Sequence, residues 1–337
     1  MLKKISLVVS GVFCLLALIA TILLFPAHWQ INNINSELPS MAQINHVFER
    51  VDSMTKTREK LPVDIRYINT AFQESSMGAL SFIGVLLTWG DGKTFLIDAG
   101  MGNEVAEAFG DTMKLIASAG PITTYGAIEK QMGSKINSIK GIGFTHLHSD
   151  HTSGIKAICD GMTQAATIYQ TLTQATEHNL HTKAGQDRIA KSGCPKINLG
   201  KGLIKPIEGF PGIFALSAGG HTPGSTIFVA KVADMTYYFA GDLTNRMEDI
   251  HINRDKGWFY SNLIVPENGV RLEQLRVWLK DIDNRKNNAV LVAHDLGAYE
   301  QTGIKPWSND TPQFLGDLPQ HSRPKLAKIP KTHYPVN

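Results

Sequence analysis

A chain of 337 residues has room for one large domain or two ordinary ones, because single hydrophobic cores stop growing at about 250–300 residues. Hydrophobic residues form 43% and charged residues 19% of the sequence, which excludes a disordered chain and a polytopic membrane protein. The formal net charge of +3 is small and spread along the chain, so no role in nucleic-acid binding is predicted.

Residues 1–25 form a separate N-terminal segment. Lys3 and Lys4 precede an uncharged apolar run from Ile5 to Phe25. As an α-helix this run would rise about 31 Å, close to the hydrocarbon thickness of a bilayer. We therefore predict a transmembrane anchor that contacts the membrane through residues 5–25, with a cleaved signal sequence as the alternative. The two lysines favour a cytoplasmic N-terminus, which places the rest of the chain in the periplasmic or extracellular space.

The cysteines agree with an exported protein but leave their pairing open. Cys14 lies inside the apolar run and has no small-residue lipidation motif before it. Cys159 and Cys194 remain as an even pair, for which a disulfide is allowed outside the cytoplasm. Two separately buried thiols are the alternative, because spacing in the sequence does not fix a distance.

The composition along the chain predicts three further segments. Residues 26–62 are polar and are interpreted as a juxtamembrane spacer with at most one short helix, whereas residues 301–337 are interpreted as a surface tail. Between them, over residues 63–300, β-rich apolar runs are broken by Gly, Pro, Asn and Asp and alternate with helical stretches. This alternation predicts a layered α/β domain.

Within this α/β region, the sequence predicts two β-hairpins and one amphipathic helix. Gly90-Asp91-Gly92 and Ala233-Asp234 each separate two apolar runs, which predicts two β-hairpins. Within residues 271–284, apolar residues recur at three-and-four spacing and predict one buried helix face. These residues are Leu272, Leu275, Leu279 and Ile282.

The stretch His146 to His151 concentrates metal-binding side chains. If the preceding "GIGFT" completes a strand, His146 and His148 point the same way, because side chains alternate along a strand. Asp150 and His151 follow in the next turn and can face a second position. The stretch thus offers two ligands to each of two metal ions, and further polar residues stand where apolar strands or tight loops end. These are His221, Asp242 and His294.

This ordered set resembles the signature of the metallo-β-lactamase-fold hydrolases, over about residues 65–300. A strand-ending Asp, the His-x-His-x-Asp-His run, and then His, Asp and His are matched by Asp98, residues 146–151, His221, Asp242 and His294. A polar turn with surface histidines would explain neither the order nor the strand-end positions. The resemblance implies an α/β fold, a four-layer αβ/βα sandwich of the metallo-β-lactamase type.

The resemblance also implies how the ligands are shared. The first metal would take His146, His148 and His221, and the second would take Asp150, His151 and His294. Asp242 would bridge the two ions, and Asp98 would orient ligands through hydrogen bonds. Imidazole and carboxylate ligands without thiolate favour two Zn²⁺ ions per chain, with Fe or Mn as alternatives.

The chemistry implied is hydrolysis of a small-molecule substrate. A metal-bridging hydroxide would attack an ester-like bond in a lactone, a thioester or a similar group, with Asp150 as a proton carrier for the leaving group. True β-lactamases of this fold generally carry Cys or Ser at the bridging position, so Asp242 favours the lactonase and glyoxalase side. Quorum-quenching lactonases carry a Tyr where this chain has Asn245.

Two alternatives stay open at this point. The stretch "GHTPGST", residues 220–226, includes Ser225 and resembles some true metallo-β-lactamases. A non-catalytic, membrane-tethered metal sensor would use the same ligands without turnover. The stretch 247–262 carries Trp258, Phe259 and Tyr260, which could form an apolar substrate wall or pack in the core.

Overall fold

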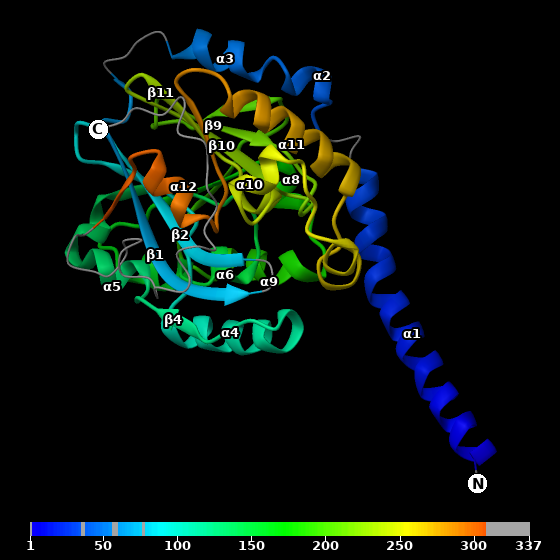
Figure 1. Cartoon of the computed structure of the whole chain (residues 1–337). Helices are drawn as coiled ribbons and strands as arrows, with labels where there is room; N and C mark the ends of the chain where they lie inside the picture. Colours follow the sequence, from blue (N-terminus) through cyan, green and yellow to red (C-terminus); the bar gives the residue numbers. More distant parts are fainter. Residues whose placement is uncertain (1, 35–37, 56–59, 76–77, 308–337) are drawn as a thin grey trace.

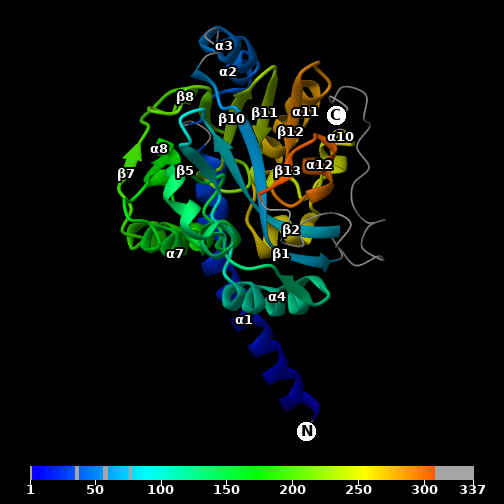
Figure 2. The same cartoon turned by 90° about the vertical axis from the view of Figure 1, so that its left-hand side faces the viewer.

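The computed structural model describes residues 2–34, 38–55, 60–75 and 78–307, so most of the predicted tail, residues 308–337, lies outside the described residues. Within the described ranges, two mixed β-sheets pack face to face and helices cover their outer faces (Figures 1 and 2). This layered arrangement confirms the predicted four-layer α/β class.

The first sheet is mixed: its edge pair β13-β1 is parallel, the pairs around β2 are antiparallel, and the strands beyond β3 are parallel. Its strands follow the order β13-β1-β2-β3-β5-β6-β7, and β4 also pairs with β1. The β1-β2 and β2-β3 pairs are antiparallel, whereas β3, β5, β6 and β7 run parallel. The strands are β1 (Asp64–Ser75), β2 (Gly78–Thr88), β3 (Thr94–Ile97), β4 (Ile122–Thr124), β5 (Ile139–Gly143), β6 (Thr167–Gln170), β7 (Lys196–Asn198) and β13 (Lys305–Pro306).

The second sheet has the order β12-β11-β10-β9-β8 and is antiparallel except for the parallel β11-β12 pair. Both predicted hairpins are confirmed, because β2 pairs with β3 and β10 pairs with β11 in antiparallel register. The strands are β8 (Ile204–Pro206), β9 (Ile213–Ser217), β10 (Thr226–Val232), β11 (Met235–Phe239) and β12 (Asn288–Leu291).

Aromatic side chains fill the space between the sheets. Phe95 on β3 and Phe228 on β10 are fully buried, and their ring centroids lie 6.0 Å apart. Gly143 ends β5 beneath this contact, and a Cβ added there would lie 2.3 Å from the Phe228 ring. The absent side chain at Gly143 therefore lets the second sheet approach the strand that leads into His146.

Helices cover both outer faces, and α11 confirms its predicted amphipathic pattern. Leu272, Leu275, Leu279 and Ile282 are all buried in the core. The helices after the N-terminal region are α4 (Asn103–Ala117), α5 (Ile128–Met132), η3 (Gly133–Ser138), α6 (Ser149–Thr152), α7 (Ile155–Asp160), α8 (Leu172–Thr176), α9 (Leu180–Ala190), η4 (Gly241–Leu243), α10 (Met247–His251), η5 (Tyr260–Ile264), α11 (Gly269–Asp283) and α12 (Leu296–Gln301).

The N-terminal helix is longer than the predicted apolar segment. Helix α1 (Leu2–Asn33) continues through Pro26, and its stretch Val9–Asn33 is long and apolar enough to cross a membrane by length and composition. The N-terminal part of α1 projects away from the body (Figure 1), whereas Ala27 and Ile31 near its C-terminal end are buried against the protein.

Residues 26–62 differ from the predicted polar spacer. The end of α1 is followed by α2 (Met41–Ile44) and α3 (Val47–Met54), which bury Ile44, Val47 and Val51 in the core between and above the sheets. The described parts of this segment thus belong to the folded body. At the other end, β13 pairs with β1 beyond the predicted boundary at residue 300, so the sheet extends to residue 306.

Cys159 and Cys194 form a disulfide, which answers the question that the sequence leaves open. The bond joins the end of α7 to the segment after α9, and Cys14 is free and exposed on α1. Structural disulfides persist in oxidising compartments. The apolar N-terminal helix and the disulfide together indicate a location outside the cytoplasm.

Candidate metal centre

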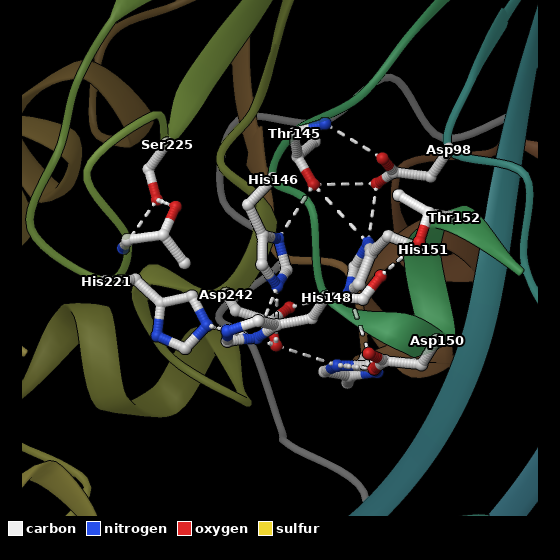
Figure 3. Close-up of polar contacts among 12 residues, drawn as sticks. Asp98, Thr145, His146, His148, Asp150, His151, Thr152, His221, Ser225 and Asp242 are labelled. Atoms are coloured by element: carbon white, nitrogen blue, oxygen red, sulfur yellow. Dashed lines mark hydrogen bonds and ion pairs between the residues drawn. The ribbon is translucent and has the colours of Figure 1, made fainter. Parts of the chain in front are cut away.

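Three imidazoles converge where β5 ends and where the β9–β10 loop turns. His146 and His148 follow β5, and His221 lies in the loop between β9 and β10 (Figure 3). The Nδ1 atom of His148 lies 3.0 Å from Nε2 of His146 and 3.2 Å from Nε2 of His221. Nitrogens held at about 2.0–2.1 Å from one zinc ion lie about 3.3 Å from one another. The spacing of the three rings therefore suits a shared metal ion.

A second group of ligand atoms lies beside the first. Asp150 and His151 belong to α6, Asp242 to η4, and His294 follows β12. His294 Nε2 lies 3.0 Å from Asp242 Oδ2 and 3.4 Å from Asp150 Oδ2, and His151 Nε2 lies 3.4 Å from Asp242 Oδ1. These four buried residues could hold a second ion.

Asp242 lies between the two groups. Its Oδ2 atom is 3.8 Å from Nε2 of both His146 and His221, in addition to its 3.0 Å contact with His294. Gly241 sets this position, since its φ of 58° is left-handed and a Cβ there would lie 2.7 Å from Thr145. The carboxylate thus has the position that a bridging ligand needs.

Asp98 links the chain after β3 to the histidine loop. Its carboxylate accepts hydrogen bonds from the backbone N–H of Thr145 at 2.8 Å, from Thr145 Oγ1 at 2.7 Å and from His151 Nδ1 at 2.9 Å (Figure 3). Asp98 itself has a φ of 63°, which is unusual for a residue with a side chain. With Nδ1 of His151 donating to Asp98, Nε2 faces the other ligands.

The structure adds a buried carboxylate that the sequence analysis did not single out. Glu267 Oε1 accepts a hydrogen bond from His221 Nδ1 at 2.5 Å, and its Oε2 accepts one from Ser261 at 2.6 Å. Lys256 donates to Glu267 at 3.1 Å and to the carbonyl oxygen of Asp242 at 2.6 Å. Neither residue ends a strand, so no pattern in the sequence marks them. His294 is oriented in a similar way, because its Nδ1 donates to the carbonyl of Ser81 at 2.8 Å.

Burial keeps the first three imidazoles neutral. It lowers the pKa of His146 and His148 well below the ordinary value, and the neighbouring imidazoles His151 and His221 respectively add to the effect. Burial and then the charge of Lys256 lower the pKa of His221. Neutral imidazoles have the free lone pair that a metal ligand requires.

In the second group, neighbouring carboxylates outweigh burial and raise the pKa of the histidines. Burial acts to lower the pKa of His151, but Asp150 and then Asp98 raise it well above the ordinary value. Burial acts to raise the pKa of Asp242, but His294 and then His146 lower it well below its ordinary value. Carboxylates in this group therefore stay ionised and attract a cation, which would replace the protons on the imidazoles.

Buried atoms left without partners support the fit of a metal ion. His151 Nε2 and Asp242 Oδ1 are buried and make no hydrogen bond of good geometry among the described residues. Leaving such polar atoms unsatisfied is costly, and coordination to a cation would satisfy both. The donor set, imidazole and carboxylate without thiolate, suits zinc.

A cavity of about 330 Å³ opens onto both groups of ligands. Its polar end includes His148, Asp150 and Asn245, together with His181 from α9, which the sequence analysis did not single out. Its other walls are mainly apolar and are formed by Leu80, Phe82, Phe109, Met113, Ile116, Ile264 and Val265, together with Tyr260. Of the predicted aromatic wall, Tyr260 lines this cavity, whereas Trp258 and Phe259 are exposed farther out.

Comparisons with known proteins agree with this geometry. Residues 82–294 match the family model described as the Metallo-beta-lactamase superfamily. An N-acyl homoserine lactone hydrolase with N-hexanoyl-L-homoserine at its catalytic metal center and a B. thuringiensis AiiA mutant with N-decanoyl-L-homoserine each give a TM-score of 0.53 at 16% identity, covering 73% of this chain and 98% of theirs. A quorum-quenching N-acyl homoserine lactone lactonase gives 0.51 at 16% identity, covering 70% and 93%. No curated protein matches the sequence.

Proposed function

Because the chain belongs to the metallo-beta-lactamase superfamily, we propose that it is a hydrolase that uses two zinc ions to cleave an ester-like bond in a small molecule. The observation that carries this proposal is the position of Asp242, whose Oδ2 lies within 3.8 Å of ligand nitrogens from both groups. His146, His148 and His221 would hold one ion, and Asp150, His151 and His294 the other. Iron or manganese could take the same places.

Such a pair of ions, when bound, would lower the pKa of a shared water toward about 7 and polarise the scissile group. The chain's own residues supply the rest. Asp150 faces the cavity from the second group and could carry a proton to the leaving group. Burial and then Glu267 raise the pKa of Tyr260 well above its ordinary value, so its phenol stays protonated and can donate a hydrogen bond to the substrate.

Several observations favour a lactone, a thioester or a similar acyl substrate. The cavity has a polar end at the ligands and apolar walls beyond it, which suits a carbonyl group attached to a hydrocarbon chain. Asp242 at the bridging position also favours this side of the superfamily over true β-lactamases. The solved lactonases share the fold, which agrees with this choice without establishing it.

The β-lactamase alternative loses part of its support. Ser225, which carries the resemblance, is buried, and its hydroxyl accepts a hydrogen bond from the backbone N–H of Thr222 at 2.9 Å. It also lies 2.9 Å from Thr222 Oγ1, so this serine closes the loop that holds His221. A structural role in the loop accounts for it without any contact with substrate.

We further propose that α1 anchors the protein and that the metal centre lies in the periplasmic or extracellular space, with secretion after signal cleavage as the alternative. Ala27 and Ile31 of α1 are buried against the body, which favours a retained helix. Protease treatment of cells that have been stripped of any outer envelope, but whose cytoplasmic membrane is intact, tests this: digestion of the body without lysis is expected. Protection until the membrane is broken would contradict the topology.

The proposed activity is tested with the full chain purified in detergent and loaded with zinc. Its metal content and its hydrolysis of a lactone, a thioester, a β-lactam and a phosphotriester are measured. Two zinc equivalents and turnover of the lactone or thioester are expected, with loss of turnover in His148→Ala and retention in His46→Ala, which changes an exposed histidine. Two equivalents without turnover of any substrate would favour the metal sensor.

A further inference from the structure

Exposed apolar side chains gather around a second cavity beside the metal centre. This cavity, of about 290 Å³, is lined by Ile116 of α4 and by Trp258 and Phe259. Trp258 is 71% exposed and Phe259 57%, and the residues adjacent to the lining, Leu115 and Leu263, are 86% and 41% exposed. We call these five residues the apolar rim. Large apolar groups clustered on a surface indicate a binding face.

The rim is continuous with the cavity at the metal centre. Both cavities share wall residues, so a common, mainly apolar wall connects the exposed aromatic residues to the candidate ligands. The shared residues are Met113, Ile116, Tyr260 and Ile264. A hydrocarbon chain lying along this wall would keep its polar end at Asp150 and its other end at the rim.

The rim also lies next to the point where α1 leaves the body. His28 of α1 is hydrogen-bonded to the carbonyl oxygen of Asn262, which directly precedes Leu263. His28 is less than one helical turn beyond Phe25, where the apolar run ends. In both views α4 lies at the end of the body toward which α1 extends (Figures 1 and 2). The rim therefore lies close to Phe25, where the predicted membrane-spanning run ends.

The exposed tryptophans near this point are typical of a protein surface at a membrane interface. Trp29 of α1 is 61% exposed and directly follows His28, which contacts Asn262, and the Asn262 side chain donates a hydrogen bond to the carbonyl of the exposed Trp258 at 2.8 Å. Two exposed tryptophans from distant parts of the sequence thus flank the same contact. Tryptophan is enriched where hydrocarbon meets lipid headgroups, because its ring is apolar and its N–H is polar. Apolar side chains that would be unfavourable in water are stabilised there.

We propose that the apolar rim inserts into the surface of the membrane that holds α1 and that the enzyme takes an amphiphilic acyl substrate from this bilayer. The substrate would be an ester-like molecule with a compact polar carbonyl end and a hydrocarbon chain. The chain would pass from the lipid along Ile116 and Tyr260, and the carbonyl would reach the metal ligands. This proposal rests on the proposed hydrolytic function and on α1 as an anchor.

The position of the rim is tested in vesicles of phosphatidylcholine and phosphatidylglycerol at 3:1. The full chain carries Cys14→Ser and one nitroxide-labelled cysteine at Leu115→Cys, at Leu263→Cys or, as a control, at Val277→Cys, an exposed apolar position on α11. Collision of the nitroxide with oxygen, which concentrates in lipid, is compared with collision with a polar nickel complex. Oxygen is expected to dominate at 115 and 263, and nickel at 277.

Substrate entry is tested with Leu115→Ser/Leu263→Ser, since neither side chain lines either cavity, against Val277→Ser. With a long-chain acyl lactone in the vesicles, the double variant is expected to raise KM several-fold. With a water-soluble short-chain lactone, both variants are expected to match the unchanged protein.

The outcomes separate this inference from the proposed function. Turnover of the soluble lactone with nickel dominating at 115 and 263 would overturn the membrane contact and leave the hydrolase. Lipid-immersed labels without turnover of any acyl substrate would support the membrane contact and overturn the substrate. Labels shielded from both reagents would indicate a second protein chain on this face and also contradict the inference.

Discussion

His221 and Glu267 form a buried imidazole–carboxylate pair, with Nδ1 of the ring 2.5 Å from Oε1 of the carboxylate. Lys256 joins the same carboxylate and also binds the carbonyl oxygen of Asp242. Lys256 thus contacts both the carboxylate that holds His221 and the backbone of Asp242, which lies between the two groups of candidate ligands. The pair fixes Nε2 of His221 toward His148, and carboxylates placed in this way commonly orient metal-bound histidines.

Replacing Glu267 by Gln should weaken zinc binding at the His146, His148 and His221 group. The amide is uncharged and holds the Nδ1–H tautomer less firmly, so zinc affinity should fall about 10- to 100-fold. Competition with a chelator, followed by metal analysis, measures this. Glu273→Gln, an exposed position on the neighbouring α11, is the control. Equal zinc affinity in the two variants would remove the role assigned to Glu267.

The contribution of Glu267 to zinc affinity should not change between pH 5 and 8. Burial acts to raise its pKa, but Lys256 and then His221 lower it to about 2, against an ordinary value of 4.5. A carboxyl group with a lowered pKa contributes fully above its ordinary value and loses the contribution as the pH falls toward about 2. The ratio of zinc affinities between the unchanged protein and Glu267→Gln is therefore expected to be constant over this range. A ratio that falls steadily from pH 8 to pH 5 would contradict this.

Asp242→Ala should remove at least one metal equivalent and most of the activity. Its carboxylate contacts His294 at 3.0 Å and lies 3.8 Å from His146 and from His221, so both groups lose a ligand atom. Metal stoichiometry and turnover are measured together, with Asp281→Ala as an exposed control. Two retained equivalents with normal turnover would exclude the bridging role of Asp242.

The candidate site could be outlined from the sequence because several of its residues follow strands. Asp98 follows β3, His146 follows β5, and His294 follows β12, so strand order alone brings these residues to one edge of the paired sheets. Glu267 and Lys256 lie in irregular segments, and His181 lies on a short helix, so nothing local to these residues indicates their position. Only the packing of distant segments places them at the site.

The packing of the N-terminal region also could not be predicted from the local sequence. Ala27, Ile31 and Ile34 are spaced as one face of a helix and are buried, which is a signal that the sequence contains. Pro26 and the polar residues around it obscured that pattern, because proline usually ends or kinks a helix. Contacts with the body stabilise this part of α1, and such tertiary packing routinely overrides local preference.

Tyr260→Phe should lower kcat while leaving the metal content unchanged. The phenol lines the cavity beside the ligands, and its raised pKa keeps the proton that it would donate to the substrate. Loss of one such donor typically reduces turnover by about 10²-fold or more in a buried site. Tyr237→Phe on β11, a buried tyrosine outside the cavity, is the matched control. Unchanged kcat in Tyr260→Phe would leave the residue with a packing role only.

Breaking the disulfide should destabilise the protein without altering the ligand groups. Cys159 and Cys194 are 35 residues apart, and closing a loop of this length restricts the unfolded chain by about 3–4 kcal/mol in the chain-entropy model. The double variant Cys159→Ser/Cys194→Ser is therefore expected to melt several degrees lower than the unchanged protein, while Cys14→Ser, at an exposed free cysteine, should melt at the same temperature. Thermal unfolding of the full chain in detergent measures both, and dithiothreitol should lower the melting temperature of the unchanged protein but not that of the double variant. Equal melting temperatures in all variants would show that the bond adds nothing to stability.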